Sequence, residues 1–229
     1  MYQNIIRKAQ FNSKPSLLIA GMDTNLSTVI EDINKISDRF SAIYYEAKDI
    51  ESDIVKSFSM GFISYYLRDA VPNNIFQAIR YSNENEKVKD VLAAWGQRWK
   101  MLDETIEDRR LADVHLNTQT HVSRSSIPFE DYWQELAKYR FLIAPRGQGV
   151  QSSKLAEAWM VKTIPIVTKT PCFTDLQNMG YPLIIIDSWE EVTPDAIQQW
   201  RLEYEQVSWS KVRYMLTNSF LDSLLSNSG

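Results

Sequence analysis

The sequence predicts an α/β fold whose sheets are mostly parallel. Short apolar segments alternate along the chain with segments of helical periodicity, which is typical of strands joined by crossover helices. The segment 183–186, Leu-Ile-Ile-Ile, is apolar at every position, as expected for a strand covered on both faces. The chain has 229 residues, of which 44% are hydrophobic, so it is long enough to bury a sizeable core.

The first half of the chain is expected to contain strands and helices in alternation. Short apolar runs predict strands over 16–21, 42–45 and 91–96. Helical spacing of apolar residues predicts a helix over 26–40, and 103–113 is expected to be an exposed helix. Residues 55–67 show no clean period, and the charged stretch 83–89 is expected to be a loop.

The second half repeats this alternation more clearly. Strands are expected over 139–144, 163–167 and 183–187. Helices are expected over 128–138, 152–162, 194–209 and 211–225, the third with proline at an early helical position. We expect two halves, 1–125 and 126–229, although one continuous sheet is the alternative.

Charge and cysteine content narrow the classes of function. The chain has 25 Lys and Arg residues against 29 Asp and Glu residues. This balance argues against a general nucleic-acid binder, because phosphate backbones require a basic surface. An anionic ligand would therefore need a local binding site. The one cysteine, Cys172, forms no intramolecular disulfide, and there is no cysteine cluster for zinc. The N-terminal residues lack a signal-peptide run, and no stretch reaches about 18 apolar residues. We therefore expect a soluble, cytoplasmic protein without a membrane span.

Glycine, hydroxyl and charged residues concentrate in segment 146–159, Arg-Gly-Gln-Gly-Val-Gln-Ser-Ser-Lys-Leu-Ala-Glu-Ala-Trp, between an expected strand and an expected helix. Gly147 and Gly149 allow a sharp bend and close approach of a ligand. Ser152 or Ser153 is suited to cap the helix. Free N–H groups at a helix N-terminus favour a phosphate or pyrophosphate.

Charged side chains flank this turn. Arg146 and Lys154 would add positive charge beside a bound phosphate. Glu157 lies three residues after Lys154 on the same helix face, where the lysine would hold phosphate and the carboxylate a ribose diol. The alternative is an ordinary surface pair of the two residues, because the segment is neither a Walker loop nor a complete GxGxxG.

With its neighbours, this turn resembles the signature of exostosin-like glycosyltransferases. Residues 139–149, Tyr-Arg-Phe-Leu-Ile-Ala-Pro-Arg-Gly-Gln-Gly, are followed by the Ser, the basic residue and the Glu-Ala of that pattern, and then by Ile-Pro-Ile-Val. Residues 181–192 are similar to the family's segment P-V-V-V-x-D-W-x-E-V, and 117–124 to its T-x-x-x-R stretch. The resemblance covers about residues 115–197. Lys154 stands where the family has arginine.

The resemblance implies a GT-B-like fold of two abbreviated Rossmann-like halves, the first for the acceptor and the second for the donor. It implies transfer of a sugar from a nucleoside-diphosphate sugar, expected to be a UDP-sugar, to a hydroxyl of an acceptor glycan, with no metal ion and no cofactor. The donor-binding residues that it implies are Arg124, Arg146, Gly147, Gly149, Ser152, Ser153, Lys154 and Glu157.

An inverting transferase also needs a general base near the acceptor hydroxyl. Asp23, in the turn after the first expected strand, is one candidate, and His121 and His115 are others. The structural alternatives are a turn or cap residue for the aspartate and a satisfied packing residue for each histidine.

Two other classes of function are compatible with the sequence. One is a catalytically inert nucleotide- or glycan-binding module of the same fold. The other is a Rossmann-like oxidoreductase, which is disfavoured because residues 21–25, Gly-Met-Asp-Thr-Asn, replace the glycine fingerprint after the first strand. The aromatic residues Phe58, Phe62, Tyr65 and Tyr66 would border an acceptor cleft or, more simply, pack in the core.

Overall fold

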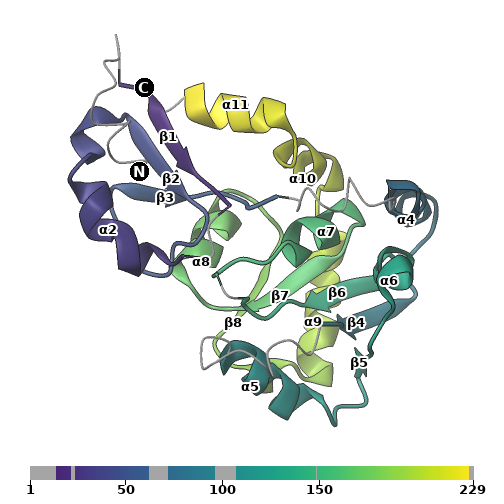
Figure 1. Ribbon diagram of the computed structural model, residues 1–229. Helices are drawn as coiled ribbons and strands as arrows, with labels where there is room; N and C mark the ends of the chain where they lie inside the picture. Colours follow the sequence, from purple (N-terminus) through teal and green to yellow (C-terminus); the bar gives the residue numbers. More distant parts are fainter. Residues whose placement is uncertain (1–13, 22–23, 62–71, 96–106, 148, 227–229) are drawn as a thin grey trace.

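The computed structural model describes residues 14–21, 24–61, 72–95, 107–147 and 149–226. Its architecture is α/β, with a three-stranded sheet in the order β1-β2-β3 and a five-stranded sheet in the order β5-β4-β6-β7-β8 (Figure 1). All neighbouring strands in both sheets pair in parallel. The predicted fold class is therefore confirmed, and two parallel sheets are compatible with a GT-B-like arrangement of two lobes.

The first sheet is built from the N-terminal part of the chain. Its strands are β1 (Ser16–Ile19), β2 (Ala42–Tyr45) and β3 (Val55–Ser57). Helix α2 (Leu26–Asn34) and the short helix η1 (Ser37–Arg39) connect β1 to β2, so the helix expected over 26–40 is real but ends earlier. Leu26 and Ile33 of α2 are buried in the core that this sheet shares with later elements.

The second sheet is covered on both faces, which explains its apolar strands. Its strands are β4 (Lys89–Ala93), β5 (Val122–Arg124), β6 (Tyr139–Ile143), β7 (Ile164–Thr168) and β8 (Ile184–Ile186). In β6, Phe141 and Ile143 pack into one core, and Leu142 packs into the core on the other face.

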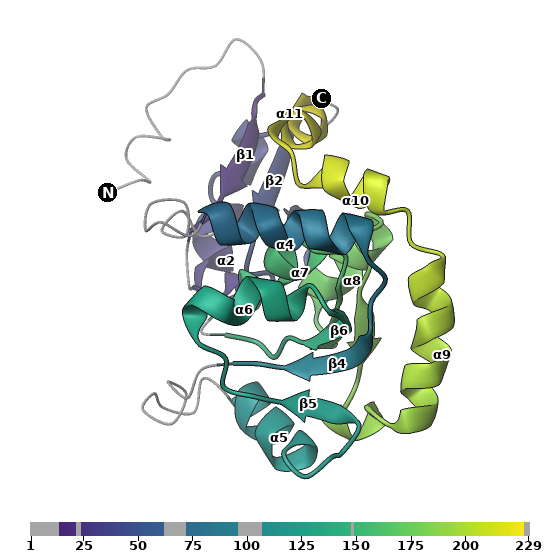
Figure 2. The ribbon, with the colours of Figure 1, turned by 90° about the vertical axis from the view of Figure 1, so that its right-hand side faces the viewer.

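Different helices cover the two faces. The face of Leu142 is covered by α4 (Pro72–Glu84), α6 (Phe129–Leu136) and α7 (Lys154–Met160), and Figure 2 shows α4 beside α6. The face of Phe141 is covered by α5 (Glu107–Leu116), η4 (Trp189–Glu191) and α9 (Pro194–Glu205). The helix expected to be exposed over 103–113 is observed as α5, but one side of it is buried, because Ala112 and Leu116 lie in this core.

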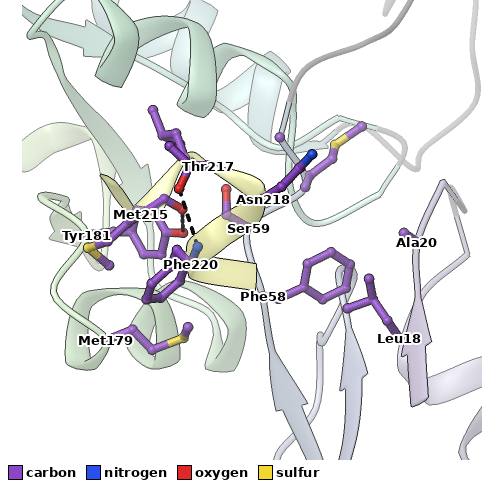
Figure 3. A pocket seen from close by; sticks show the side chains of 13 residues that line it. Leu18, Ala20, Phe58, Ser59, Met179, Tyr181, Met215, Thr217, Asn218 and Phe220 are labelled. Carbon is purple, nitrogen blue, oxygen red and sulfur yellow. Dashed lines mark hydrogen bonds between the residues drawn. The ribbon is translucent and has the colours of Figure 1, made fainter. Parts of the chain in front are cut away.

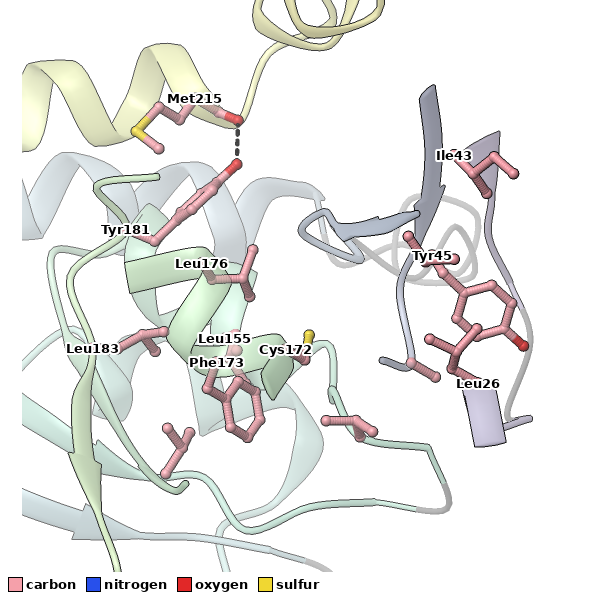
Figure 4. Close-up of a cluster of buried hydrophobic side chains, with 14 of the residues drawn as sticks. Leu26, Ile43, Tyr45, Leu155, Cys172, Phe173, Leu176, Tyr181, Leu183 and Met215 are labelled. Atoms are coloured by element: carbon pink, nitrogen blue, oxygen red, sulfur yellow. Dashed lines mark hydrogen bonds between the residues drawn. The ribbon is translucent and has the colours of Figure 1, made fainter. Parts of the chain in front are cut away.

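Helix α8 (Pro171–Asn178) lies between the two sheets (Figure 4). Its buried Cys172, Phe173 and Leu176 share a core with Tyr45 of β2 and Val167 of β7. Polar contacts join the same elements, because Asp175 accepts hydrogen bonds from Lys48 Nζ at 2.9 Å and from Ser57 Oγ at 2.7 Å. Residues of both sheets therefore pack against one helix.

The division between the sheets differs from the boundary expected at 125/126. Because β4 and β5 pair with each other and β4 pairs with β6, that position falls inside the second sheet. The chain passes from the first sheet to the second between Ser57 and Lys89. The last helices, α10 (Trp209–Met215) and α11 (Asn218–Ser226), return to the core of the first sheet, where Met215 is buried and Phe220 packs beside it (Figure 1).

The helix expected over 211–225 is divided at Thr217, between α10 and α11. The Thr217 hydroxyl donates to the Tyr214 carbonyl at 2.7 Å and accepts from the Phe220 N–H at 3.3 Å. A side chain that satisfies the end of one helix and the start of the next favours a break at that residue. The helix expected over 194–209 likewise ends at Glu205, and Trp209 begins the next one.

Lys87 is buried beneath the second sheet's helices, with 5% of its surface exposed. Its ammonium group donates to the carbonyl oxygens of Ala137 and Val161 and to the Thr163 hydroxyl. Ala137 and Val161 are the C-terminal caps of α6 and α7, so the lysine satisfies carbonyls that the helices leave free. Burial, with repulsion from Lys162 and Arg140, lowers the pKa of Lys87 to about 7.

This pKa predicts a stability that rises with pH. Between pH 7 and pH 9 the unfolded chain keeps the Lys87 proton that the folded chain loses, so the free energy of unfolding should increase over this range. In Lys87→Met this increase with pH should disappear. The substitution also leaves the Ala137 and Val161 carbonyls without a donor, which should lower the free energy of unfolding by about 1–3 kcal/mol. Urea denaturation at several pH values measures both effects, with Lys35→Met on the surface as the control. Equal pH slopes in all three proteins would contradict the prediction.

Candidate functional site

The carboxyl ends of the two sheets meet at the loop that follows β6. Gln151 in this loop donates through Nε2 to the carbonyls of Glu46 and Phe58, both at 2.7 Å. Its Oε1 accepts from the Met60 N–H at 3.0 Å. Since Glu46 directly follows β2 and Phe58 directly follows β3, one buried amide joins three strand ends. Ligands of parallel α/β sheets bind outside the carboxyl ends of the strands, which makes this loop the candidate site.

Two arginines lie at the glycine turn. The side chain of Arg146 is 43% exposed. Arg109, from α5, donates through Nε to the Arg146 carbonyl at 3.0 Å. A Cβ atom at Gly147 would lie 3.3 Å from Arg109 Nη2, so this glycine is needed for close approach, whereas its φ is not in the left-handed region. Burial lowers the pKa of Arg109, and the Asp108 carboxylate beside it opposes that shift.

Asp108 holds the loops that follow three strands of the second sheet. Its buried carboxylate accepts from the Arg146 N–H at 2.7 Å, from Thr168 Oγ1 at 3.1 Å and from Trp189 Nε1 at 2.9 Å. These residues follow or end β6, β7 and β8 in turn. Asp108, Arg109 and Gln151 were not predicted to be site residues, because each contacts residues that lie far from it along the chain.

A pocket of about 260 Å³ opens beside these loops at the carboxyl ends of β6, β7 and β8. Its charged and titratable lining residues are Asp108, His115, Arg146, Lys169 and Asp187. His115 Nδ1 lies 3.6 Å from a carboxylate oxygen of Glu190. The pocket therefore brings Arg146 and one of the histidines from the sequence analysis to the same edge of the sheet.

The start of α7 differs from the expected helix. The helix begins at Lys154 rather than at residue 152 and has seven residues. Ser153 adopts a helical conformation without a capping hydrogen bond, and Ser152 Oγ is buried without a hydrogen-bond partner in the described residues. The predicted capping role of these serines is therefore wrong, and a helix this short provides no developed N-terminal phosphate site.

Lys154 is partly buried and points to an aromatic face. Its ammonium lies 4.0 Å from the centre of the Tyr132 ring, a cation–π contact. Burial lowers the pKa of Lys154, the Glu157 carboxylate opposes that shift, and Arg109 adds to it. Lys154 is therefore electrostatically coupled to Glu157 and to Arg109, whose Nε contacts the Arg146 carbonyl.

Glu157 is completely buried, with 0% of its surface exposed. Among the described residues neither of its carboxylate oxygens has a hydrogen-bond partner, and it forms no direct ion pair with Lys154. The alternative of an exposed Lys154–Glu157 surface pair is therefore wrong. A buried carboxylate without partners is costly, because the charge loses its hydration without compensation.

Other predicted residues lie elsewhere. Arg124 stacks on the Trp95 ring at 4.1 Å, bonds Asp113 at 3.1 Å and donates to the Ala93 carbonyl, so its guanidinium is occupied within the protein. His121 precedes β5 and contacts the Val192 carbonyl at 2.8 Å. Because the strands are parallel, it lies at the amino edge of the sheet, opposite to the loop after β6.

The remaining residues singled out in the sequence either lie outside the described residues or are buried. Asp23 and Gln148 lie outside the described residues. Gly149 is buried in the loop between β6 and α7. Cys172 is buried in α8 rather than in a turn, and burial raises the pKa of its thiol to about 12, which makes it a poor nucleophile.

Within the described ranges, no group of three or more His, Cys, Asp or Glu side chains is arranged to hold a metal ion. None of the described helices has the length and apolar character that crossing a bilayer requires.

Comparison with solved structures gives distant structural similarity. No family model matches the chain, and no curated protein matches it in sequence, so the exostosin-like resemblance stays a prediction. The wall teichoic acid polymerase TagF is similar in structure with a TM-score of 0.25 and 9% identity, over 92% of this chain. The match spans 63% of the TagF chain, less than two thirds of its length.

Proposed function

We propose that the chain is a glycosyltransferase that binds a nucleoside-diphosphate sugar, preferably a UDP-sugar, at the loop after β6 and transfers the sugar to an acceptor hydroxyl. The observation that carries this proposal is Glu157, a fully buried carboxylate whose oxygens have no partner in the described residues. The resemblance of segment 139–167 to exostosin-like enzymes supports the same assignment.

A ribose diol matches the needs of this carboxylate. An ionised carboxylate only accepts hydrogen bonds, and the two hydroxyls of a ribose can donate one to each oxygen. Such charge-assisted bonds are about twice as strong as neutral ones. Because Glu157 is fully buried in the ligand-free protein, binding requires the side chains that cover it to move.

The cations around the loop suit a diphosphate. Arg109 lies at the glycine turn, since its Nε donates to the backbone carbonyl of Arg146, and Lys154 begins the helix that follows the turn. Guanidinium groups bind phosphate oxygens in pairs, and the lysine adds a point charge. In the transfer step, these groups would stabilise the negative charge on the departing diphosphate without a metal ion.

Sugar transfer also needs a general base near the acceptor hydroxyl. Of the two histidines, His115 lines the pocket with Arg146, whereas His121 lies at the opposite edge. We therefore prefer His115 to His121. The position of His121 and the occupied guanidinium of Arg124 favour, as the second candidate, an inert nucleotide- or glycan-binding module of the same fold.

A nucleotide panel tests this function. Thermal shifts are measured with UDP, GDP, TDP, CMP and NAD, each with and without EDTA. We expect UDP or GDP to raise the melting temperature equally with and without the chelator, because bound ligand stabilises the folded state. Hydrolysis or transfer of the matching nucleotide sugar separates the transferase from the inert module. A shift with NAD alone would overturn both.

Arg109→Met should weaken binding of the stabilising nucleotide about 10- to 100-fold, the range expected for a lost charged hydrogen bond of about 1.5–3 kcal/mol. Arg110→Met is the matched control, because Arg110 is the next residue of α5 but is exposed and pairs with Glu107. Titration calorimetry on both variants measures the difference. If both bind the nucleotide as tightly as the wild type, Arg109 does not contact it.

A further inference from the structure

A second cavity, of about 380 Å³, lies at the carboxyl end of the first sheet (Figure 3). Leu18 and Ala20 line it from the end of β1, and Phe58 lines it from the residue after β3. Met179, which follows α8, and the junction of α10 with α11 close the other side. The cavity thus occupies the edge at which parallel sheets bind ligands, and no residue of the proposed donor site lines it.

Among the described residues that line this cavity, none is charged. The surface comes from aliphatic, aromatic and thioether groups, including Met60, Met179 and Met215, whose flexible side chains adapt to different shapes. The hydroxyl of Tyr181 is already used, since it donates to the Met215 carbonyl at 2.9 Å. This lining excludes a phosphate or a carboxylate and favours a neutral apolar ligand.

Size and polar groups define the ligand further. A water molecule occupies roughly 30 Å³ in the liquid, so the cavity volume corresponds to about a dozen chemical groups of that size. The Ser59 hydroxyl and the Asn218 amide also line the cavity, and the Asn218 side chain makes no hydrogen bond within the described residues. One amide with free donor and acceptor capacity suits a single hydroxyl on the ligand.

The cavity is connected to the candidate donor site through Gln151. This side chain accepts from the Met60 N–H and donates to the Phe58 carbonyl, and both residues line the cavity. The same side chain belongs to the loop that carries Arg146 and Lys154. A compound in the cavity would therefore lie against elements that are fixed to that loop.

We propose that this cavity binds the apolar body of a neutral aliphatic or aromatic alcohol of about ten non-hydrogen atoms. This assignment rests on the proposed function: the bound alcohol is the part of the acceptor whose hydroxyl receives the sugar. The acceptor would then carry an apolar group, in contrast to the all-sugar acceptor that the family resemblance implies.

The test uses 1-octanol as the probe and the full chain as the protein. Ala20 is exposed at the cavity wall, so Ala20→Trp fills the space without disturbing the core, and Ala20→Ser keeps it open. Titration calorimetry should show saturable octanol binding to the wild type and to Ala20→Ser, and at least tenfold weaker binding to Ala20→Trp. The polyol myo-inositol, which has no apolar body, should not bind. Absence of octanol binding to the wild type, or equal binding to all three proteins, would overturn the proposal.

Nucleotide binding, measured by thermal shift on the same proteins, separates this proposal from the proposed function. Octanol binding that Ala20→Trp abolishes, without any nucleotide binding, supports the cavity as an alcohol site and removes its role as an acceptor site. Nucleotide binding without octanol binding keeps the donor site and overturns the cavity proposal. Formation of octyl glycoside from a UDP-sugar would support both.

Discussion

Replacing Asp108 with alanine should destabilise the protein by about 1–3 kcal/mol and weaken nucleotide binding at least tenfold. The carboxylate accepts from the Arg146 N–H and from the Trp189 indole N–H, at 2.7 Å and 2.9 Å. Without it the Arg146 N–H loses its acceptor, whereas Trp189 Nε1 keeps the Asp108 carbonyl at 3.1 Å, and one unpaired buried donor costs about 1–3 kcal/mol. The loop that carries Arg146 would then lose its fixed position.

Urea denaturation and nucleotide titration measure the two effects of Asp108→Ala. Glu107→Ala is the matched control, because Glu107 is the preceding residue of α5, is exposed and pairs only with Arg110 in the described structure. Asp108→Asn keeps one oxygen acceptor and should fall between the wild type and the alanine variant. If Asp108→Ala unfolds at the same urea concentration as Glu107→Ala, Asp108 does not hold the loops together.

Replacing Glu157 with methionine should act in opposite directions on stability and on binding. Methionine has a similar length and fills the space without a charge, so the ligand-free protein should gain about 1–3 kcal/mol from removal of an unsatisfied buried group. Nucleotide affinity should fall at least tenfold, because the ribose hydroxyls lose their acceptor. Functional sites keep such destabilising groups when a ligand satisfies them.

Thermal denaturation with and without UDP measures both parts of the Glu157→Met prediction. Glu203→Met on the exposed surface of α9 is the control for the general effect of this substitution. A lower melting temperature of Glu157→Met would mean that the carboxylate stabilises the ligand-free protein. Unchanged affinity for UDP would remove Glu157 from the donor site, whatever happens to stability.

Most strands could be predicted from the sequence because they contain a short apolar run, whereas β3, Val-Lys-Ser, and β5, Val-Ser-Arg, contain none and were not predicted. Segment 42–45 matches β2 residue for residue, and 139–144 differs from β6 only at its last residue. Polar helices were harder to recognise. Helix α4 was missed because its sequence is largely polar and Phe76 faces solvent, and α8 was missed because Pro171 marks a turn as often as a helix start. Thr170 before that proline was the overlooked capping signal.

The candidate site could be predicted only where its residues are neighbours in the sequence. The turn from Arg146 to Glu157 was found because glycines and charges cluster there. Arg109 lies 37 residues from the carbonyl that it contacts, and Gln151 lies 105 residues from Glu46, so no local pattern links them. The burial of Glu157 was also invisible, since its charge and helical spacing are those of an exposed residue.

The side-chain amide of Gln151 adds a polar connection between the two lobes to the packing around α8. Its nitrogen and oxygen together hold the backbone of three residues, Glu46, Phe58 and Met60. A sliding motion of one lobe past the other would have to break these bonds at once. A ligand that moves the loop after β6 inward would therefore also move the residues that directly follow β2 and β3. A displacement at the nucleotide site would in this way be transmitted to the first sheet.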